Sequence, residues 1–344
     1  MLCLVSPESR VPSDHPLRDI KKLADVALRE LSPVFDAMYA ETGRPSVPPE
    51  RLLKSLLLIA LHSIRSERQF CEQLEYNLLF RWFVDMEMLE AAFDASTFSR
   101  NRERLMEHEV AALFFAAVRR HAAALMSSEH FSVDGTLIEA WASMKSFRPK
   151  DDDEGDNNGW GDFRGERRRN DTHESKTDSE ARLMRKGNGR EAKLCFAGHA
   201  LMENRNGLLV DLTVSEANGT AERDTALSML EEHASRGATV GADRGYDTRG
   251  FVQSCRERGV TPHVAQHQNE RRSSAIDGRT TRHAGYRISQ TTRMRIEKIF
   301  GWIKSVGGLR RTRYRGRART QLAAYFVGAA YNLLRVARLQ RCSA

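Results

Sequence analysis

The chain has 344 residues, of which 40% are hydrophobic and 29% are charged, a composition typical of a folded globular protein with a sizeable core. Nine prolines and 23 glycines exclude a collagen-like or wholly disordered chain. The five cysteines form no CxxC pair, which argues against a zinc ribbon or disulfide framework and favours a reducing cytoplasm. No apolar run reaches the roughly 18–20 residues of a membrane span, and the start, MLCLVSPESR, lacks the pattern of a signal peptide.

The positive charge is concentrated near the C-terminus. Residues 271–341 contain 18 Lys and Arg but two acids, a net charge of +16, so the rest of the chain carries −8. So one-sided a distribution favours a polyanion partner, most simply nucleic acid, over a solvated surface. Anionic lipid is the less favoured alternative, because the long helix predicted over 320–338 has the pattern of a core helix.

Residues 1–126 have helical apolar spacing. Helices are expected from Pro48-Pro49 onward, over Ser66–Leu79 and over Ser96–Met126. Short connections predict a small bundle. The stretch SERQFCEQLEYNLLFRWF fits a helix-turn-helix and plain bundle packing equally well.

The pattern changes after residue 126. Runs of β-branched and aromatic residues predict strands, at 131–141, 193–202, 207–214, 238–243 and 261–266. Amphipathic spacing predicts helices at 220–234, 247–258 and 291–306. This order indicates a mixed five-stranded sheet with flanking helices, an α/β (α+β) fold preceded by an all-α domain.

A polar, Gly-rich stretch at about 145–191 interrupts this pattern and predicts an exposed insertion or hairpin. Trp160 and Phe163 within it favour a contact role over a floppy loop. We therefore expect three parts: a helical domain at 1–126, a core with this insertion at 127–310, and a basic segment with a C-terminal helix at 311–344.

Three acids occupy unusual positions. Asp134 lies inside the first strand, Asp243 closes the fourth strand before Gly245, and Glu297 lies on the helix at 291–306. A carboxylate within an apolar strand is costly unless it is paired, and the C-terminal end of a strand is a common place for a site in an open α/β sheet. Taken singly, each acid fits a cap, an ion pair or a surface residue equally well.

Convergence of these acids would make a cation site. Hard carboxylate oxygens without a Cys or His set favour Mg²⁺ or Mn²⁺ over zinc, and two such ions about 3.5–4 Å apart suit phosphoryl transfer. On the predicted helix, Arg293 and Lys304 share a face with Glu297 and are expected to bind phosphates. A surface ion pair is the alternative.

Further cations are expected to follow a phosphate backbone. They are Arg244, Arg310, Arg311, Arg313, Arg315 and Arg317. Arg244 and Tyr246, beside Asp243, either touch the scissile phosphate or shape the turn. His199 and His263 are expected to be core histidines.

Long stretches of the chain have a familiar pattern. They include ETGRPSVPPE (41–50), SERQFCEQLEYNLLFRWFV (66–84), FSVDGTLIEAWASMKSFRPK (131–150), GADRGYDTR (241–249) and RIEKIFGWIKSVGGLRRTRYRGRAR (295–319). In these stretches the chain closely resembles bacterial DDE transposases of the insertion-sequence-five family. The resemblance implies an RNase-H-like core, Asp134, Asp243 and Glu297 as its acidic triad, and two Mg²⁺ or Mn²⁺ ions.

The related insertion-sequence-four signature places Tyr, Arg, Glu and Lys along the last helix. Arg293, Glu297 and Lys304 match the final three members, whereas Gln290 stands in the position of Tyr. The departure removes any role that needs a phenol.

The resemblance therefore implies a transposase that cuts element ends and joins the 3′-hydroxyl to target DNA. Its expected partners are terminal inverted repeats, target DNA and a second copy of the chain, with residues 1–126 binding DNA ends or dimerising. The expected location is the bacterial cytoplasm, at the nucleoid, without a membrane partner. A nuclease that cannot join DNA and a non-enzymatic DNA-binding repressor are the alternatives.

Overall fold

The computed structural model describes residues 6–38, 46–150, 168–185, 187, 189–267 and 273–343. The chain forms two compact units. The helical unit comprises Met1–Met126, Gly301–Gly308 and Tyr325–Ala344, and the sheet unit comprises Ser127–Phe300 and Leu309–Ala324. Within the described ranges, no helix is both long and apolar enough to cross a membrane.

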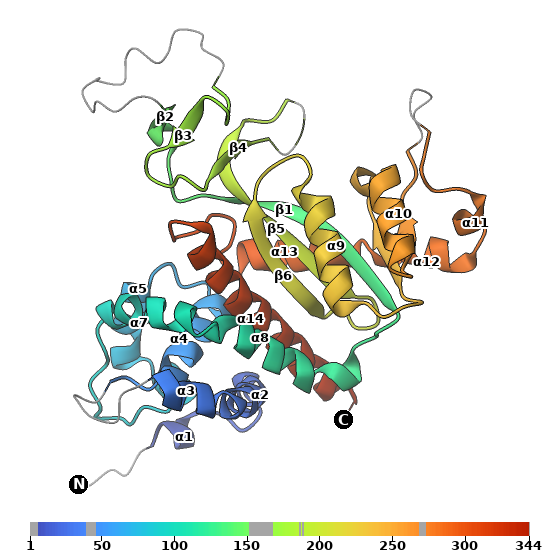
Figure 1. The fold of residues 1–344 in the computed structure, drawn as a ribbon. Helices are drawn as coiled ribbons and strands as arrows, with labels where there is room; N and C mark the ends of the chain where they lie inside the picture. The colour runs from blue at the N-terminus through green and yellow to red at the C-terminus, as the bar shows by residue number, and fades with distance from the viewer. Residues whose placement is uncertain are drawn as a thin grey trace. The chain divides into compact units, whose positions relative to one another are not determined.

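Among the described residues, the helical unit begins with eight α-helices and a 3₁₀ turn, and Figure 1 shows their arrangement. They are α1 (Pro7–Arg10), α2 (Leu17–Glu30), α3 (Ser32–Met38), α4 (Pro49–Leu61), α5 (Glu67–Tyr76), α6 (Leu78–Phe83), α7 (Ser96–Glu107), α8 (Val110–His121) and η1 (Ala123–Leu125). Two helices predicted as continuous are split. Asn77 ends α5 and caps α6 by accepting a hydrogen bond from the Phe80 amide at 3.2 Å. Glu109, with φ of 50°, separates α7 from α8.

The α5–α6 segment packs as part of a bundle. Four of the six residues of α6 are buried, including Arg81, which is 2% exposed. The Arg81 guanidinium donates to the Leu74 carbonyl at 2.9 Å and to the Glu87 carbonyl at 3.2 Å. A recognition helix needs an exposed face for base edges, so this geometry favours bundle packing over a helix-turn-helix.

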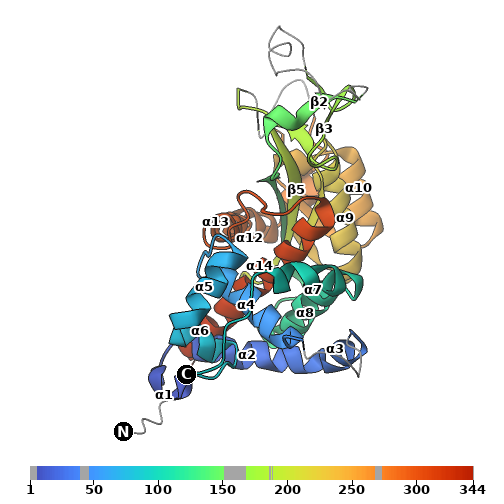
Figure 2. The ribbon, with the colours of Figure 1, turned by 90° about the vertical axis from the view of Figure 1, so that its left-hand side faces the viewer.

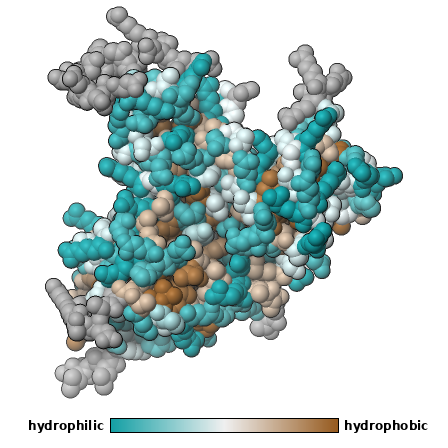
Figure 3. All heavy atoms as spheres, viewed as in Figure 1, coloured by the Kyte–Doolittle hydropathy of each residue, from teal (hydrophilic) through white to brown (hydrophobic). Residues whose placement is uncertain are grey.

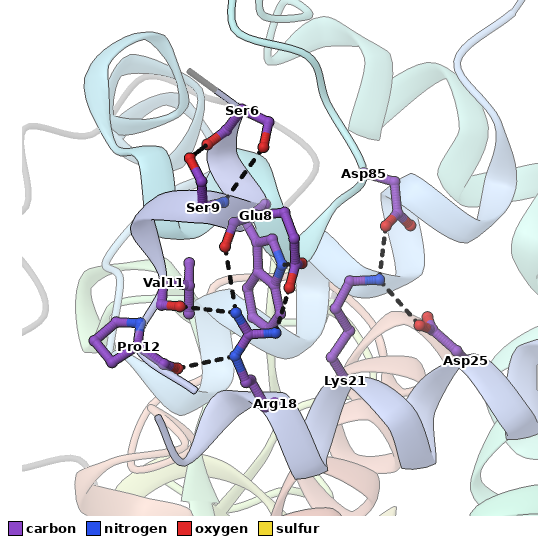
Figure 4. Close-up of polar contacts among 10 residues, drawn as sticks. Ser6, Glu8, Ser9, Val11, Pro12, Arg18, Lys21, Asp25 and Asp85 are labelled. Carbon is purple, nitrogen blue, oxygen red and sulfur yellow. Dashed lines mark hydrogen bonds and ion pairs between the residues drawn. The ribbon is translucent and has the colours of Figure 1, made fainter. Parts of the chain in front are cut away.

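Four charges neutralise one another in the helical unit, and we call them the Lys21 cluster: Lys21, Lys54, Asp25 and Asp85. Lys21 Nζ lies 2.9 Å from Asp25 and 2.6 Å from Asp85 (Figure 4), and Lys54 Nζ pairs with both carboxylates. Burial opposes the charged forms, but the hydrogen bonds outweigh it, so the pKa of Lys21 is raised and that of Asp85 is lowered. The pKa shifts therefore favour the charged forms of Lys21 and Asp85.

Two helices pass from one unit into the other. They are α13 (Arg295–Ser305) and α14 (Arg317–Ser343). Within the helical unit, Phe326 of α14 packs against Phe114 with ring centroids 6.1 Å apart. This division differs from the predicted separate part at 311–344, because the apolar side of α14 completes the core of the helical unit.

The sheet unit contains a six-stranded mixed sheet. Its strands are β1 (His130–Glu139), β4 (Arg182–Met184), β5 (Lys193–Glu203), β6 (Leu209–Glu216), β7 (Thr239–Ala242) and β8 (Thr261–Val264). The order is β6-β5-β1-β7-β8, antiparallel from β6 to β1 and parallel from β1 to β8. This arrangement confirms the predicted RNase-H-like mixed sheet. The sixth strand, β4, was not predicted, and it pairs with β5 beyond the end of β6.

Helices cover both faces of this sheet. Helices α9 (Ala221–His233) and α10 (Arg249–Glu257) lie on one face, and α12 (Ala284–Thr292) lies on the other (Figures 1 and 2). Two short elements complete the unit, the 3₁₀ turn η4 (Arg244–Tyr246) and α11 (Gly278–Thr281). The apolar strands are thus buried on both sides, as expected for parallel strands.

The described residues of the polar insertion include a two-stranded antiparallel sheet. After η2 (Met144–Ser146), strand β2 (Phe147–Pro149) pairs antiparallel with β3 (His173–Ser175). Phe147 is buried and stacks on His173 at 5.5 Å. The predicted contact residues Trp160 and Phe163 lie outside the described residues.

Hydrophilic side chains cover most of the face seen in Figure 3, with apolar patches between them. The exposed large apolar residues include Leu89 in the helical unit and Trp141, Ile288 and Met294 in the sheet unit. Scattered apolar residues are normal on a protein surface.

Candidate active site

The sheet register brings the two predicted aspartates to the same level. Ser132 of β1 pairs with Gly241 of β7 in a parallel ladder. Asp134 lies two residues after Ser132, and Asp243 lies two residues after Gly241, just past the end of β7. The two aspartates are therefore expected at the same level of the sheet, on neighbouring strand paths. Asp243 follows the last residue of β7 and accepts a hydrogen bond from the Gly245 amide at 2.8 Å, which begins η4. Gly245 permits this close turn.

The Asp134 carboxylate is poorly compensated. Burial, with the nearby charges of Asp243 and Glu222, raises the pKa of Asp134 to about 7, against the opposing effects of the Gly135 amide and Arg293. The Gly135 amide donates to Asp134 Oδ1 at 2.8 Å. Carboxylates brought together in partial burial repel one another, and a bound cation relieves that repulsion.

Glu222 was missing from the sequence-based site and lies against it. A Cβ placed on Gly135 would lie 2.6 Å from Glu222 Oε1, so the carboxyl group packs directly on β1. Burial and Asp243 raise the pKa of Glu222, although the residue retains solvent exposure and Arg223 acts in the opposite direction. The available signal was an acid in the first turn of the predicted helix at 220–234, which is common at helix N-termini for other reasons.

Tyr246 lies in the core beneath these acids. It is 1% exposed and its ring contacts Phe251 edge to face. Burial and the charges of Glu222, Asp134 and Asp243 raise the pKa of Tyr246 well above its usual value. This burial favours the alternative in which Tyr246 shapes the turn over a contact with the scissile phosphate. Arg244, in contrast, is exposed.

The predicted helix at 291–306 is not continuous. Helix α12 ends at Thr292, Arg293 and Met294 form a turn, and α13 begins at Arg295. Arg293 therefore lies on the C-terminal end of α12 and not one turn before Glu297 on a shared helix. Its charge still acts on Asp134.

Glu297 and Lys304 both lie on α13. Glu297 is exposed, and it is not among the charges that raise the pKa of Asp134, Glu222 or Tyr246. Over the described ranges, no three His, Cys, Asp or Glu side chains form a metal-binding group. The structure thus brings Asp134 and Asp243 together, and the place of Glu297 in the triad stays a prediction.

The basic segment divides into anchored and exposed cations. Arg311 donates to the Ala140 and Trp141 carbonyls at 3.1 and 2.8 Å and lies over the Trp141 ring. Arg317 pairs with Glu180 at 3.9 Å. Arg310 and Arg315 are exposed and Arg313 is half-buried. Arg311 therefore also fastens this segment to the end of β1.

Two core histidines lie in the sheet. His199 is completely buried, with Nε2 2.8 Å from the Ser215 hydroxyl. His263 is 6% exposed, with Nδ1 2.6 Å from the Ser289 hydroxyl. Burial lowers the pKa of each to about 4, so both are neutral at pH 7.

Divalent cations fit the residues that are present. The carboxylates of Asp134 and Asp243 offer hard oxygen donors, and the charge of the nearby Glu222 adds to their excess negative charge. Among the residues that the structure describes, no third acid or histidine completes a metal-binding group with them. Mg²⁺ and Mn²⁺ prefer such ligands.

Comparisons with known proteins identify the family of the chain. The model of the family "Transposase DDE domain" matches residues 128–333, and that of "Transposase domain (DUF772)" matches residues 5–104. None of the curated proteins compared with the chain matches it at a significant level.

Solved structures show distant similarity. A piggyBac transposase synaptic complex with hairpin DNA is 11% identical, with a TM-score of 0.40 over 92% of this chain and 75% of that chain. A Mos1 transposase paired-end complex with the left transposon end is 10% identical, with a TM-score of 0.21 over 88% of this chain and 82% of that one. The family model alone spans more than half of the sequence and includes both aspartates. The chain therefore belongs to the DDE transposase family.

Proposed function

We propose that the chain cuts DNA at the ends of an insertion sequence and joins the freed 3′-hydroxyl to target DNA by two-metal phosphoryl transfer. Membership of the insertion-sequence-five family is part of this proposal. The observation that carries it is that Asp134 and Asp243, each two residues beyond the paired Ser132 and Gly241, lie close enough for the charge of Asp243 to raise the pKa of Asp134, within reach of the Arg293 charge. The two aspartates concentrate negative charge where a phosphodiester can bind only together with cations.

In this proposal Asp134, Asp243 and Glu297 hold two divalent cations. When bound, such ions stabilise the attacking and leaving oxygens of an in-line displacement. In the first reaction, a water oxygen bonds to phosphorus and the bond to the 3′ oxygen breaks, which leaves a 3′-hydroxyl and a 5′-phosphate. In the second, that hydroxyl bonds to a target phosphorus and displaces another 3′ oxygen. Neither step forms a bond between DNA and protein.

Cationic side chains bind the DNA. Arg293 and Lys304 are assigned to phosphates next to the reacting bond, because guanidinium and ammonium groups neutralise phosphoryl oxygens. The exposed Arg244, Arg310 and Arg315 are assigned to the flanking backbone, together with Arg311, Arg313 and Arg317. Residues 1–126 are assigned to binding DNA ends or to dimerisation, because two ends must be held together for joining.

Cleavage of DNA segments that flank the gene tests the proposal. The wild-type protein should cut such DNA with Mg²⁺ or Mn²⁺ and join pre-cut 3′ ends to a plasmid. Asp134→Asn and Asp243→Asn should each reduce both rates by at least about 10³-fold, because charge stabilisation in the transition state is lost. Asp224→Asn, on an exposed acid of α9, is the matched control and should retain both rates.

Four results would each contradict a part of the proposal. Cleavage by the Asp243→Asn protein would show that the assigned site does not catalyse the reaction. Cleavage without joining of pre-cut ends would identify a nuclease, and DNA binding without cleavage under any metal would identify a repressor. Light scattering of the end-bound complex should give at least two protein copies, and an active monomeric complex would exclude the assigned dimer.

A further inference from the structure

The last turn of α12 is fastened to two strands through one hydroxyl group. Ser289 is completely buried, and its Oγ lies 2.6 Å from His130 Nε2 of β1 and 2.6 Å from His263 Nδ1 of β8. A hydroxyl can accept an N–H from one neutral imidazole and donate its hydrogen to the other. Ser289 therefore links α12 to the strands on both sides of β7.

Close packing removes the remaining freedom of this turn. A Cβ placed on Gly241 of β7 would lie 3.4 Å from Arg293 Cβ, from the Ser289 carbonyl oxygen and from Ser132 Oγ. The helix backbone thus packs against β7 with space for little more than a methyl group at Gly241. The root of the Arg293 side chain is thereby fixed over the strand that ends at Asp243.

Gln290 holds the Arg293 side chain further out. Its Nε2 donates to the His263 carbonyl at 2.5 Å, and its Oε1 accepts from Arg293 Nε at 2.8 Å. The amide is therefore a bridge between the β8 backbone and the guanidinium. Within the described residues, the Arg293 Nη atoms make no hydrogen bond, so they can bind a phosphate in the bidentate manner typical of arginine.

We propose that Gln290 and Ser289 are positioning residues that aim Arg293 at the phosphate bound by Asp134 and Asp243. This inference rests on the proposed function. An unrestrained arginine side chain has many rotamers, and fixing it in one of them costs conformational entropy. A side chain that is already ordered before DNA binds does not lose this entropy on binding. Gln290 thus has an assigned role at the position where the related signature has Tyr.

Nuclear magnetic resonance of the DNA-free protein gives the first test. The ¹H–¹⁵N signal of Arg293 Nε can be assigned by its loss in Arg293→Lys. We expect slow solvent exchange of this proton in the wild-type protein and at least about tenfold faster exchange in Gln290→Met, which lacks both hydrogen-bonding groups. Thr291→Ala, on an exposed neighbour in α12, is the matched control and should leave the exchange rate unchanged.

A double-mutant cycle on the joining rate gives the second test. Gln290→Met should lower the rate about tenfold in the wild-type background, because a hydrogen bond to a charged group is lost. In the Arg293→Ala background it should change the rate by less than about twofold, because Gln290 acts only through Arg293. Gln290→Glu keeps the acceptor for Arg293 and should retain slow Nε exchange, even if Gln290→Met folds poorly.

The outcomes separate this inference from the proposed function. Equal effects of Gln290→Met in both backgrounds, or unchanged Nε exchange in Gln290→Met, would overturn the positioning role. Either result leaves the loss of activity in Asp243→Asn untouched. Activity in Asp243→Asn would remove the proposed function without altering the exchange measurement.

Discussion

The two units differ in how the charges of their clustered carboxylates are compensated. In the helical unit, Asp25 and Asp85 are matched by Lys21 and Lys54, and the pKa of Asp85 is lowered. In the sheet unit, burial and neighbouring acids raise the pKa of Asp134 to about 7. A structural cluster is neutralised by its own fold, whereas an active site keeps charge in excess for a ligand to neutralise.

The largest expected effect comes from breaking the neutral cluster. Lys54→Met should lower the free energy of unfolding by about 1–2 kcal/mol, because it removes a buried ammonium group that pairs with Asp25 and Asp85, whose solvent exposure screens part of the loss. Urea unfolding measures this change. Lys22→Met, on an exposed neighbour of Lys21, is the control and should cost less than about 0.5 kcal/mol. Equal stability of the two variants would contradict the comparison.

Acid should affect the sheet unit first. The pKa values of His199 and His263 are about 4, below the ordinary 6.5, so the unfolded state binds more protons between these values. Their contribution to stability is complete above pH 6.5 and is lost as pH falls toward 4. From pH 7.5 to 5.5 the loss should be about 1 kcal/mol for each histidine.

Hydrogen exchange followed by mass spectrometry can locate this loss. Amides of β5 and β8 should lose protection at pH 5.5 after correction for intrinsic rates. Amides of α4 should lose less, because the lowered pKa of Asp85 keeps that carboxylate ionised over this range, where it pairs with Lys54 of α4. Burial also lowers the pKa of His62. The helical unit is therefore expected to lose some stability in acid, but less than the sheet unit. Equal losses of amide protection in β8 and α4 would contradict the expected difference in acid sensitivity between the two units.

The smallest expected effect has the opposite sign. Asp134→Asn should raise the free energy of unfolding by about 1 kcal/mol at pH 8 in a chelator, because it removes a charge that burial and neighbouring acids disfavour. The same substitution should abolish cleavage. Asp224→Asn should change neither quantity. If Asp134→Asn destabilised the metal-free protein, the Asp134 charge would be stabilised by the fold, and the comparison between the two units would be wrong.

Local signals in the sequence were sufficient for most elements. The predicted strand at 193–202 and helix at 220–234 match β5 and α9 to within a residue at each end. The errors include the missed strand β4 and breaks in two predicted helices. Asn77 offered a cap and Glu109 adopted a positive φ, and neither overrides apolar spacing when the sequence is read alone.

The candidate site was only partly predictable. Asp134 and Asp243 stood out because a carboxylate at or beside an apolar strand needs an explanation. Glu222 did not, because its approach to Gly135 depends on how α9 lies on the sheet. Arg293 was assigned to the wrong helix, since the turn between α12 and α13 keeps nearly helical hydrogen bonds.

By itself, the sequence determined the class of fold, the strand positions, the excess of positive charge near the C-terminus and the resemblance that names the acids. These depend on residue type and short-range periodicity, which neighbouring residues carry. Only the tertiary structure decided that α14 contributes to both units, that Glu222 lies against β1, and that Gln290 holds Arg293. Those contacts join residues far apart in the chain, and their formation depends on packing geometry that no local pattern encodes.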